Sequence, residues 1–149
     1  VGFVMSMKLP LGVIDIPYES ESVTTGDVAE FLEDKYGIMA HFFWLYGPII
    51  AELMAESIAG QLENIIAGAP PSKDPFAEAM SKVHDLFVNF LDDEEMNGMP
   101  GVPTLRALMG ISKRFKDKKG QPRPSFIDTG TYQAAMRAWV SGVPNAFPE

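Results

Sequence analysis

The chain has 149 residues, no cysteine, 46% hydrophobic residues and a formal net charge of −8. This length is that of one domain with a real core, and the lack of cysteine excludes disulfide bonds and thiolate chemistry within it. The negative charge argues against general nucleic-acid binding, because phosphates attract cations.

The charge is unevenly distributed along the chain. Residues 1–100 hold 4 Lys/Arg against 17 Asp/Glu, whereas residues 101–149 hold 8 against 3. The C-terminal third is therefore a basic part of an acidic protein, and contacts with an acidic partner are expected there.

Residues 1–22 are predicted to form an extended arm. Pro10, Gly12 and Pro17 disfavour a helix, and residues 13–16 make at most one short strand. Such an arm, with no strand partner nearby in the sequence, either docks on another subunit or crosses its own core. The sequence leaves both alternatives open.

The first helix is predicted to begin after Thr24 and to stop at Gly37. Threonine is a favourable N-cap, Asp27 places negative charge in the first turn, and glycine is the usual residue just after a helix.

The next stretch, residues 38–67, predicts the longest helix, around which the rest of the chain is expected to be organised. Its first part is apolar on every side except at His41, and Glu52 closes the apolar run. That run is shorter than the ~20 residues of a membrane span, so we expect a buried helix and no membrane. Pro48 removes one helical hydrogen bond and predicts a kink or a break.

A third helix is predicted from Asp74 as N-cap, with Pro75 in the first position, to about Leu91. The Gly- and Pro-rich residues 96–103 follow as a loop. Thr104 is then expected to cap a short helix that ends near residue 109.

Residues 110–127 are predicted to form a basic loop. Its cations are candidate contacts with an acidic protein neighbour, possibly another copy's glutamates: Lys113, Arg114, Lys116, Lys118, Lys119 and Arg123. Two alternatives are a solvated loop without a partner and, for residues 106–123, binding to nucleic-acid phosphates.

A C-terminal helix is predicted over residues 128–142, with Asp128 as its N-cap. The sequence from Phe126 to Thr131 also resembles the catalytic turn of aspartic proteases. However, that fold needs several strands, and the 19 residues after Gly130 have a helical pattern. We therefore interpret Asp128 as a cap.

Other patterns that suggest chemistry are incomplete. Residues 93–98 resemble the start of a calcium loop, but Thr104 stands where the bidentate Glu belongs. His41 and His84 are predicted to lie on separate helices, with no evident third metal ligand. We accordingly predict no catalytic residue, cofactor or metal, and no enzyme activity.

Residues 123–132, Arg-Pro-Ser-Phe-Ile-Asp-Thr-Gly-Thr-Tyr, follow a basic Gly/Pro-containing stretch and precede a helical pattern with Arg137. This arrangement resembles the virion-morphogenesis proteins of tailed bacteriophages, in which an apolar-Asp-Thr-Gly turn opens a helix. That family commonly continues with Leu-Arg where this chain has Tyr132-Gln133. The resemblance implies a small, non-enzymatic tail-completion or head–tail joining subunit that assembles as a ring.

Taken together, residues 1–149 are predicted to form one mainly α domain with a long kinked helix, an extended arm and a basic loop; an α+β fold with a small sheet is the alternative. The resemblance implies partners among copies of itself and the neck, portal or tail proteins of a virion assembled in the host cytoplasm. A helical nucleic-acid-binding or regulatory module is the alternative function, and a small hydrolase a third.

Overall fold

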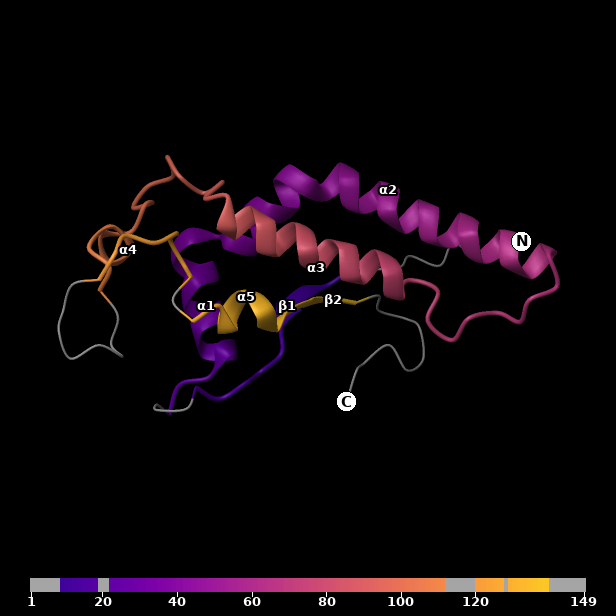
Figure 1. Cartoon of the computed structure of the whole chain (residues 1–149), viewed down its shortest axis with the longest axis horizontal. Helices are drawn as coiled ribbons and strands as arrows, with labels where there is room; N and C mark the ends of the chain where they lie inside the picture. The colour runs from indigo at the N-terminus through magenta and orange to yellow at the C-terminus, as the bar shows by residue number, and fades with distance from the viewer. Residues whose placement is uncertain (1–8, 19–21, 112–119, 128, 140–149) are drawn as a thin grey trace.

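The computed structural model describes residues 9–18, 22–111, 120–127 and 129–139. Its elements in chain order are β1 (Leu11–Val13), α1 (Thr25–Tyr36), α2 (Ile38–Ile66), α3 (Ala77–Asp92), α4 (Leu105–Leu108), α5 (Thr131–Ala135) and β2 (Met136–Ala138). Helices α2 and α3 lie side by side, and α3 also contacts α5 and β2 (Figure 1). A mainly α fold with a small sheet is therefore confirmed.

The central element is α3, which corrects the prediction that the chain is organised around residues 38–67. Helix α3 buries five of its 16 residues, whereas α2 buries three of its 29. Helix α3 is more buried than α2 because it is covered by α2 on one side and by α5 and β2 on another.

The boundaries of α1 are those that its sequence predicts. The backbone N–H of Thr24 donates to the Asp27 carboxylate at 2.9 Å, and the Asp27 N–H donates to the Thr24 hydroxyl. Gly37 ends the helix at a φ of 62°, in the left-handed region that glycine tolerates. The Glu33 carboxylate then accepts the N–H groups of Met39 and Ala40, so that it caps the start of α2.

The remaining helix predictions hold with small shifts. Helix α2 is unbroken across Pro48, so the predicted break is absent, although its ribbon changes direction along the first half (Figure 1). The Asp74 carboxylate accepts the N–H of Phe76, which is the N-cap of α3. The Thr104 hydroxyl accepts the N–H of Ala107 and caps α4 as predicted.

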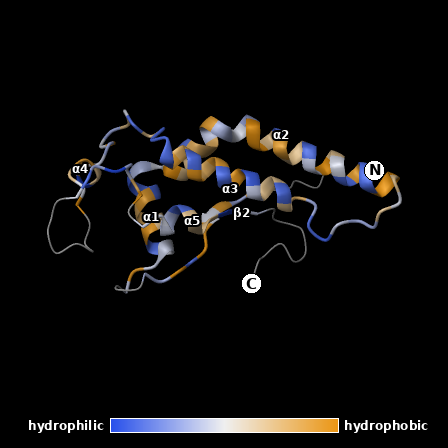
Figure 2. Cartoon of the chain, in the orientation of Figure 1, coloured by the Kyte–Doolittle hydropathy of each residue, from blue (hydrophilic) through white to orange (hydrophobic). Residues whose placement is uncertain are grey.

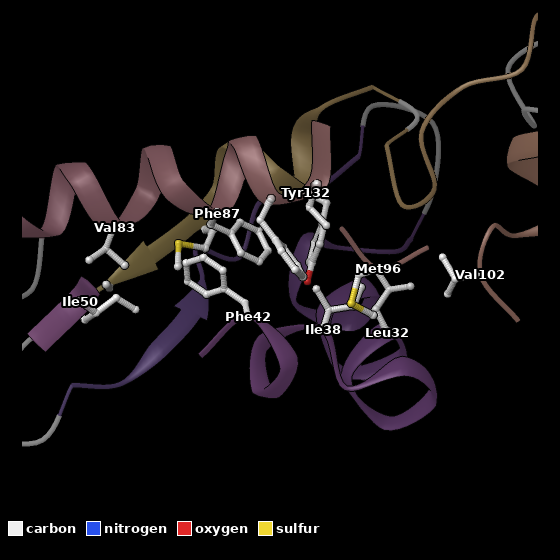
Figure 3. Close-up of a cluster of buried hydrophobic side chains, with 13 residues drawn as sticks. Leu32, Ile38, Phe42, Ile50, Val83, Phe87, Met96, Val102 and Tyr132 are labelled. Atoms are coloured by element: carbon white, nitrogen blue, oxygen red, sulfur yellow. The ribbon is translucent and has the colours of Figure 1, made fainter. Parts of the chain in front are cut away.

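The core is an aromatic cluster between α2, α3 and α5 (Figure 3). The ring of Phe87 lies 5.2 Å from that of Phe42 and 6.1 Å from that of Tyr132, both edge to face. This geometry is favourable for aromatic pairs. Burial raises the pKa of the Tyr132 phenol, which lies among apolar side chains.

The described part of the N-terminal arm crosses the chain's own core. Strand β1 pairs antiparallel with β2, with Val13 opposite Met136. The buried Thr25 hydroxyl donates to the carbonyl of Ile14 and accepts the N–H of Ile16 at 2.7 Å. Residues 9–18 are thus bound to the same molecule rather than left for another subunit.

The helix predicted over residues 128–142 is wrong in its second half. Helix α5 ends at Ala135 and the chain continues as strand β2, while residues 140–142 lie outside the described part. Met136 and Ala138 are buried and Arg137 between them is not, which is the alternation of a strand. The spacing of the apolar residues after Thr131 fits both the 3.6-residue period of a helix and the two-residue period of a strand. Pairing with β1 makes residues 136–138 a strand.

We expect Thr25→Val to destabilise the protein by about 1–3 kcal/mol, because a carbonyl and an N–H inside the fold would lose their partner. Thr25→Ser keeps the hydroxyl and should cost less. Urea denaturation of both variants measures the difference. Equal losses would mean that the methyl group of Thr25, and not its hydrogen bonds, holds the arm.

Candidate protein interface

One side of α2 is apolar and is not covered by any other described element. Trp44 is 74% exposed, Leu62 55% and Ile66 85%. The exposed large apolar residues of this helix are Phe43, Trp44, Leu45, Ile49, Ile58, Leu62, Ile65 and Ile66. The prediction of a buried helix is therefore wrong for most of α2, which buries Ile38, Phe42 and Ile50 alone.

Helical spacing places Trp44, Ile58, Leu62, Ile65 and Ile66 on the side of α2 that is opposite the buried residues, and we call this side the outer face of α2. Small exposed residues recur every four positions, at Ala51, Ala55 and Ala59, between Trp44 and Leu62. Residues at this spacing lie along one side of a helix, where small side chains leave a groove beside larger ones. Orange segments recur along the exposed α2 in Figure 2.

The outer face exists because α2 is apolar on more sides than the fold covers. Helix α3 packs along one side only, through the contacts that bury Phe42 and Ile50. Each large apolar side chain left in water forgoes about 1.5–3 kcal/mol of burial. Contiguous exposed apolar surfaces of this kind mark interaction sites.

Helix α2 is also long and apolar enough, by length and composition alone, to cross a membrane. Core helices of soluble proteins pass the same test, but they are mostly buried. In α2, 17% of the most apolar 18-residue window is buried, so most of this stretch lies outside the core. No element that the structure describes covers its outer face.

The flank of the outer face is acidic. Helix α2 contains Glu52, Glu56 and Glu63 and no Lys or Arg. The pKa of Lys82 on α3 is raised, mainly because the Glu78 carboxylate lies 2.8 Å from its ammonium group. The charge of Glu56 on α2 raises this pKa further. Neither Glu52 nor Glu63 forms a salt bridge with any residue that the structure describes. A cationic partner would therefore be favoured along this flank.

A second apolar surface lies on α4. Leu105 is 70% exposed, Leu108 53% and Met109 40%, with exposed Arg106 between them. We call these four residues the α4 tip. Buried Ala107 fixes its orientation, since its carbonyl accepts the N–H of Arg123 at 3.1 Å.

Most of the residues that were predicted to contact a partner lie outside the described part of the chain. Lys113, Arg114, Lys116, Lys118 and Lys119 lie outside the described residues. Arg123 is described: its side chain donates to the carbonyls of Ile127 at 2.7 Å and Ile111 at 3.1 Å. Arg123 thus links Ile111, which follows α4, to Ile127, which precedes α5.

The proposed cap Asp128 also lies outside the described residues. The N-cap position of α5 is held by Gly130, at a φ of 76°, and it makes no side-chain hydrogen bond. The Thr129 hydroxyl accepts the N–H of Thr131 at 3.0 Å instead. A turn followed by a helix is therefore present at this motif, with Thr129 in a capping contact.

The residues considered for metal chemistry make internal contacts. His84 Nδ1 lies 2.8 Å from the carbonyl of Met136, and the His41 ring stacks on Trp44. Within the described ranges, no three His, Asp or Glu side chains are grouped so as to hold a metal ion.

Two of the three carboxylates in the calcium-like stretch, those of Glu94 and Glu95, accept hydrogen bonds. Asn97 donates to Glu94 at 2.6 Å, and the Tyr46 phenol donates to Glu95. The bond to Glu95 raises the pKa of Tyr46 to about 12. The contact between Tyr46 and Glu95 joins α2 to the turn after α3, whereas the contact between Asn97 and Glu94 lies within that turn.

A depression lined in part by Phe90, Met96, Val102 and Phe126 is too shallow to enclose even a water molecule, so it does not suggest a ligand. Comparisons with protein families, with curated proteins and with solved structures find no match to this chain. Functional inference therefore depends on the two exposed apolar surfaces and their charges.

Proposed function

We propose that this protein is a structural subunit that acts by assembling with copies of itself and with other proteins of a larger particle. The observation that supports this is the outer face of α2, where Trp44, Leu62 and Ile66 are each more than half exposed. The buried centre of a subunit interface is more apolar than the rest of a protein surface and is enriched in aromatic side chains. This role requires no catalytic residue and no cofactor.

The particle that we propose is a tailed-phage virion, with the subunit at the head–tail junction as a neck, connector or tail-completion ring. The resemblance of residues 123–132 to virion-morphogenesis proteins supports this place. The turn at Thr129 and Gly130, followed directly by α5, agrees with the arrangement in that family. The partners would be portal, neck or tail proteins.

Nucleic-acid binding is the alternative function. It is favoured by exposed Arg106 and by the excess of Lys/Arg over Asp/Glu in residues 101–149, 8 against 3. Phosphate contacts would make the affinity fall steeply with salt, whereas an apolar interface is much less salt-sensitive. Tight duplex binding in a salt titration would favour this alternative.

Negative-stain electron microscopy of the purified chain, with cosedimentation on phage heads and on tails, tests the proposal. We expect closed rings or short stacks, and retention on one of the two particles. A chain that stays monomeric and sediments with neither would refute assembly as its function.

A further inference from the structure

We propose that the outer face of α2 in one copy binds the α4 tip of the next copy. The inference rests on the proposed assembly function and adds which two surfaces meet. It commits to a second copy of this chain as the partner, with Leu105, Leu108 and Met109 seated against Leu62 and Ile66 at the far end of the outer face.

The α4 tip and the far end of the outer face, at Leu62 and Ile66, lie toward opposite ends of the molecule. Figure 1 shows α4 at one end of the long axis and the last turns of α2 at the other. One molecule therefore cannot cover its own last turns of α2 with its own α4 tip. Between molecules the same distance is an advantage, because each copy would present one surface to each of two neighbours.

The two surfaces are complementary in shape, because one forms a ridge and the other a groove. Leu105, Leu108 and Met109 are spaced three and four apart, so that they form a short ridge. The exposed alanines of α2 leave a groove of the kind that receives such a ridge. Both surfaces are apolar and exposed, so that docking would remove both from water.

The surfaces are also complementary in charge. The flank of the α2 face carries Glu52, Glu56 and Glu63. The α4 tip carries Arg106, which makes no ion pair with any described residue, and the described residues 104–111 and 120–127 contain no Asp or Glu. Opposite charges beside an apolar contact favour this partner and set its register.

The same charges disfavour pairing of two α2 faces. A symmetric α2–α2 contact would bring together three glutamates from each helix, with no Lys or Arg in either. Like charges at a close interface are costly. The favoured contact is therefore between unlike surfaces, and such a head-to-tail contact generates a ring when its rotation closes.

The lack of native cysteine allows a direct test by disulfide trapping between single-cysteine variants. Ala59→Cys marks the α2 face and Met109→Cys marks the α4 tip. Ser81→Cys, exposed on α3 and nearly isosteric, is the matched control. Each variant is mixed with a size-tagged version of another variant, oxidised mildly and separated on a non-reducing gel.

We expect the mixed disulfide between Ala59→Cys and Met109→Cys to exceed every other combination by at least about tenfold, since only docked thiols lie within bonding reach. Cross-linking of Ala59→Cys with itself would overturn this inference and indicate symmetric α2 pairing, while the proposed function would stand. An assembled mass without the mixed disulfide would also overturn the inference alone. A monomeric mass would overturn the inference, and it would overturn the proposed function as well if the chain also sediments with neither phage heads nor tails.

A charge variant gives a second, independent measurement. Arg106→Glu should raise the dissociation constant of self-association by about tenfold at low salt, because the acidic flank of α2 would then face a carboxylate. Arg106→Lys should have little effect. An unchanged dissociation constant in Arg106→Glu would contradict the proposed contact.

Discussion

Phe42→Ala is expected to lower the free energy of unfolding by about 3–5 kcal/mol, while Phe43→Ala lowers it by less than about 1 kcal/mol. The two phenylalanines are neighbours in α2, but Phe42 is fully buried and Phe43 is 49% exposed. The ring of Phe42 lies 5.2 Å from Phe87 and 5.5 Å from Phe90. Its removal would therefore leave a cavity in the aromatic core.

The measurement is urea denaturation at protein concentrations low enough to keep the chain monomeric, because assembly would add to the apparent stability. If Phe42→Ala does not fold, Phe42→Leu replaces it, with an expected loss of about 1–2 kcal/mol. Equal losses for the two neighbours would show that α2 packs on α3 through a different side.

The second large effect is on self-association. The double variant Leu62→Glu, Ile66→Glu should raise the dissociation constant at least about a hundredfold, because two apolar side chains that become buried on assembly are replaced by charges. Both positions are more than half exposed in the single chain, so the fold should be retained. Sedimentation velocity and a circular dichroism spectrum of each protein measure the two quantities.

Phe31→Glu is the matched control, since Phe31 is 59% exposed but lies on α1. It should leave the dissociation constant nearly unchanged. An equal effect of the control would mean that any added carboxylate opposes association. Flotation of the unmodified chain with liposomes adds a further check: recovery in the lipid fraction would mean that a bilayer, rather than a protein, covers α2.

The parts of the fold that sequence predicts well are those set by local chemistry. Thr24, Gly37 and Thr104 act where they are predicted to act, because a cap or a stop depends on residues within one helical turn. The hydrogen bond between Tyr46 and Glu95 spans 49 positions of the chain, and no sequence pattern indicates it.

Two of the wrong predictions, the helix over residues 136–138 and the burial of α2, have a common physical cause. Strand β2 forms because residues 11–13, more than a hundred positions away, offer a backbone partner. The outer face of α2 stays exposed because, among the described elements, α3 is the long helix that packs on α2, and it covers the opposite side. In both cases the outcome depends on which neighbour is available, and periodicity does not contain that information.

The candidate interface was only partly visible in the sequence. The charge excess of residues 101–149 includes Arg106, which belongs to α4. The apolar residues of the α4 tip resemble an ordinary core stripe, because Leu105 and Leu108 have helical spacing. One signal was available for α2: a helix that is apolar on all sides at its start needs more than one neighbour.

The most direct test of assembly is the mass of the purified, unmodified chain by light scattering across a concentration series. We expect a species of several times 16.4 kDa that dissociates on dilution. The Leu62→Glu, Ile66→Glu variant should remain at about 16.4 kDa throughout. A chain that stays at the monomer mass at every concentration, and whose mass is unchanged when phage heads or tails are added, would contradict the proposed assembly.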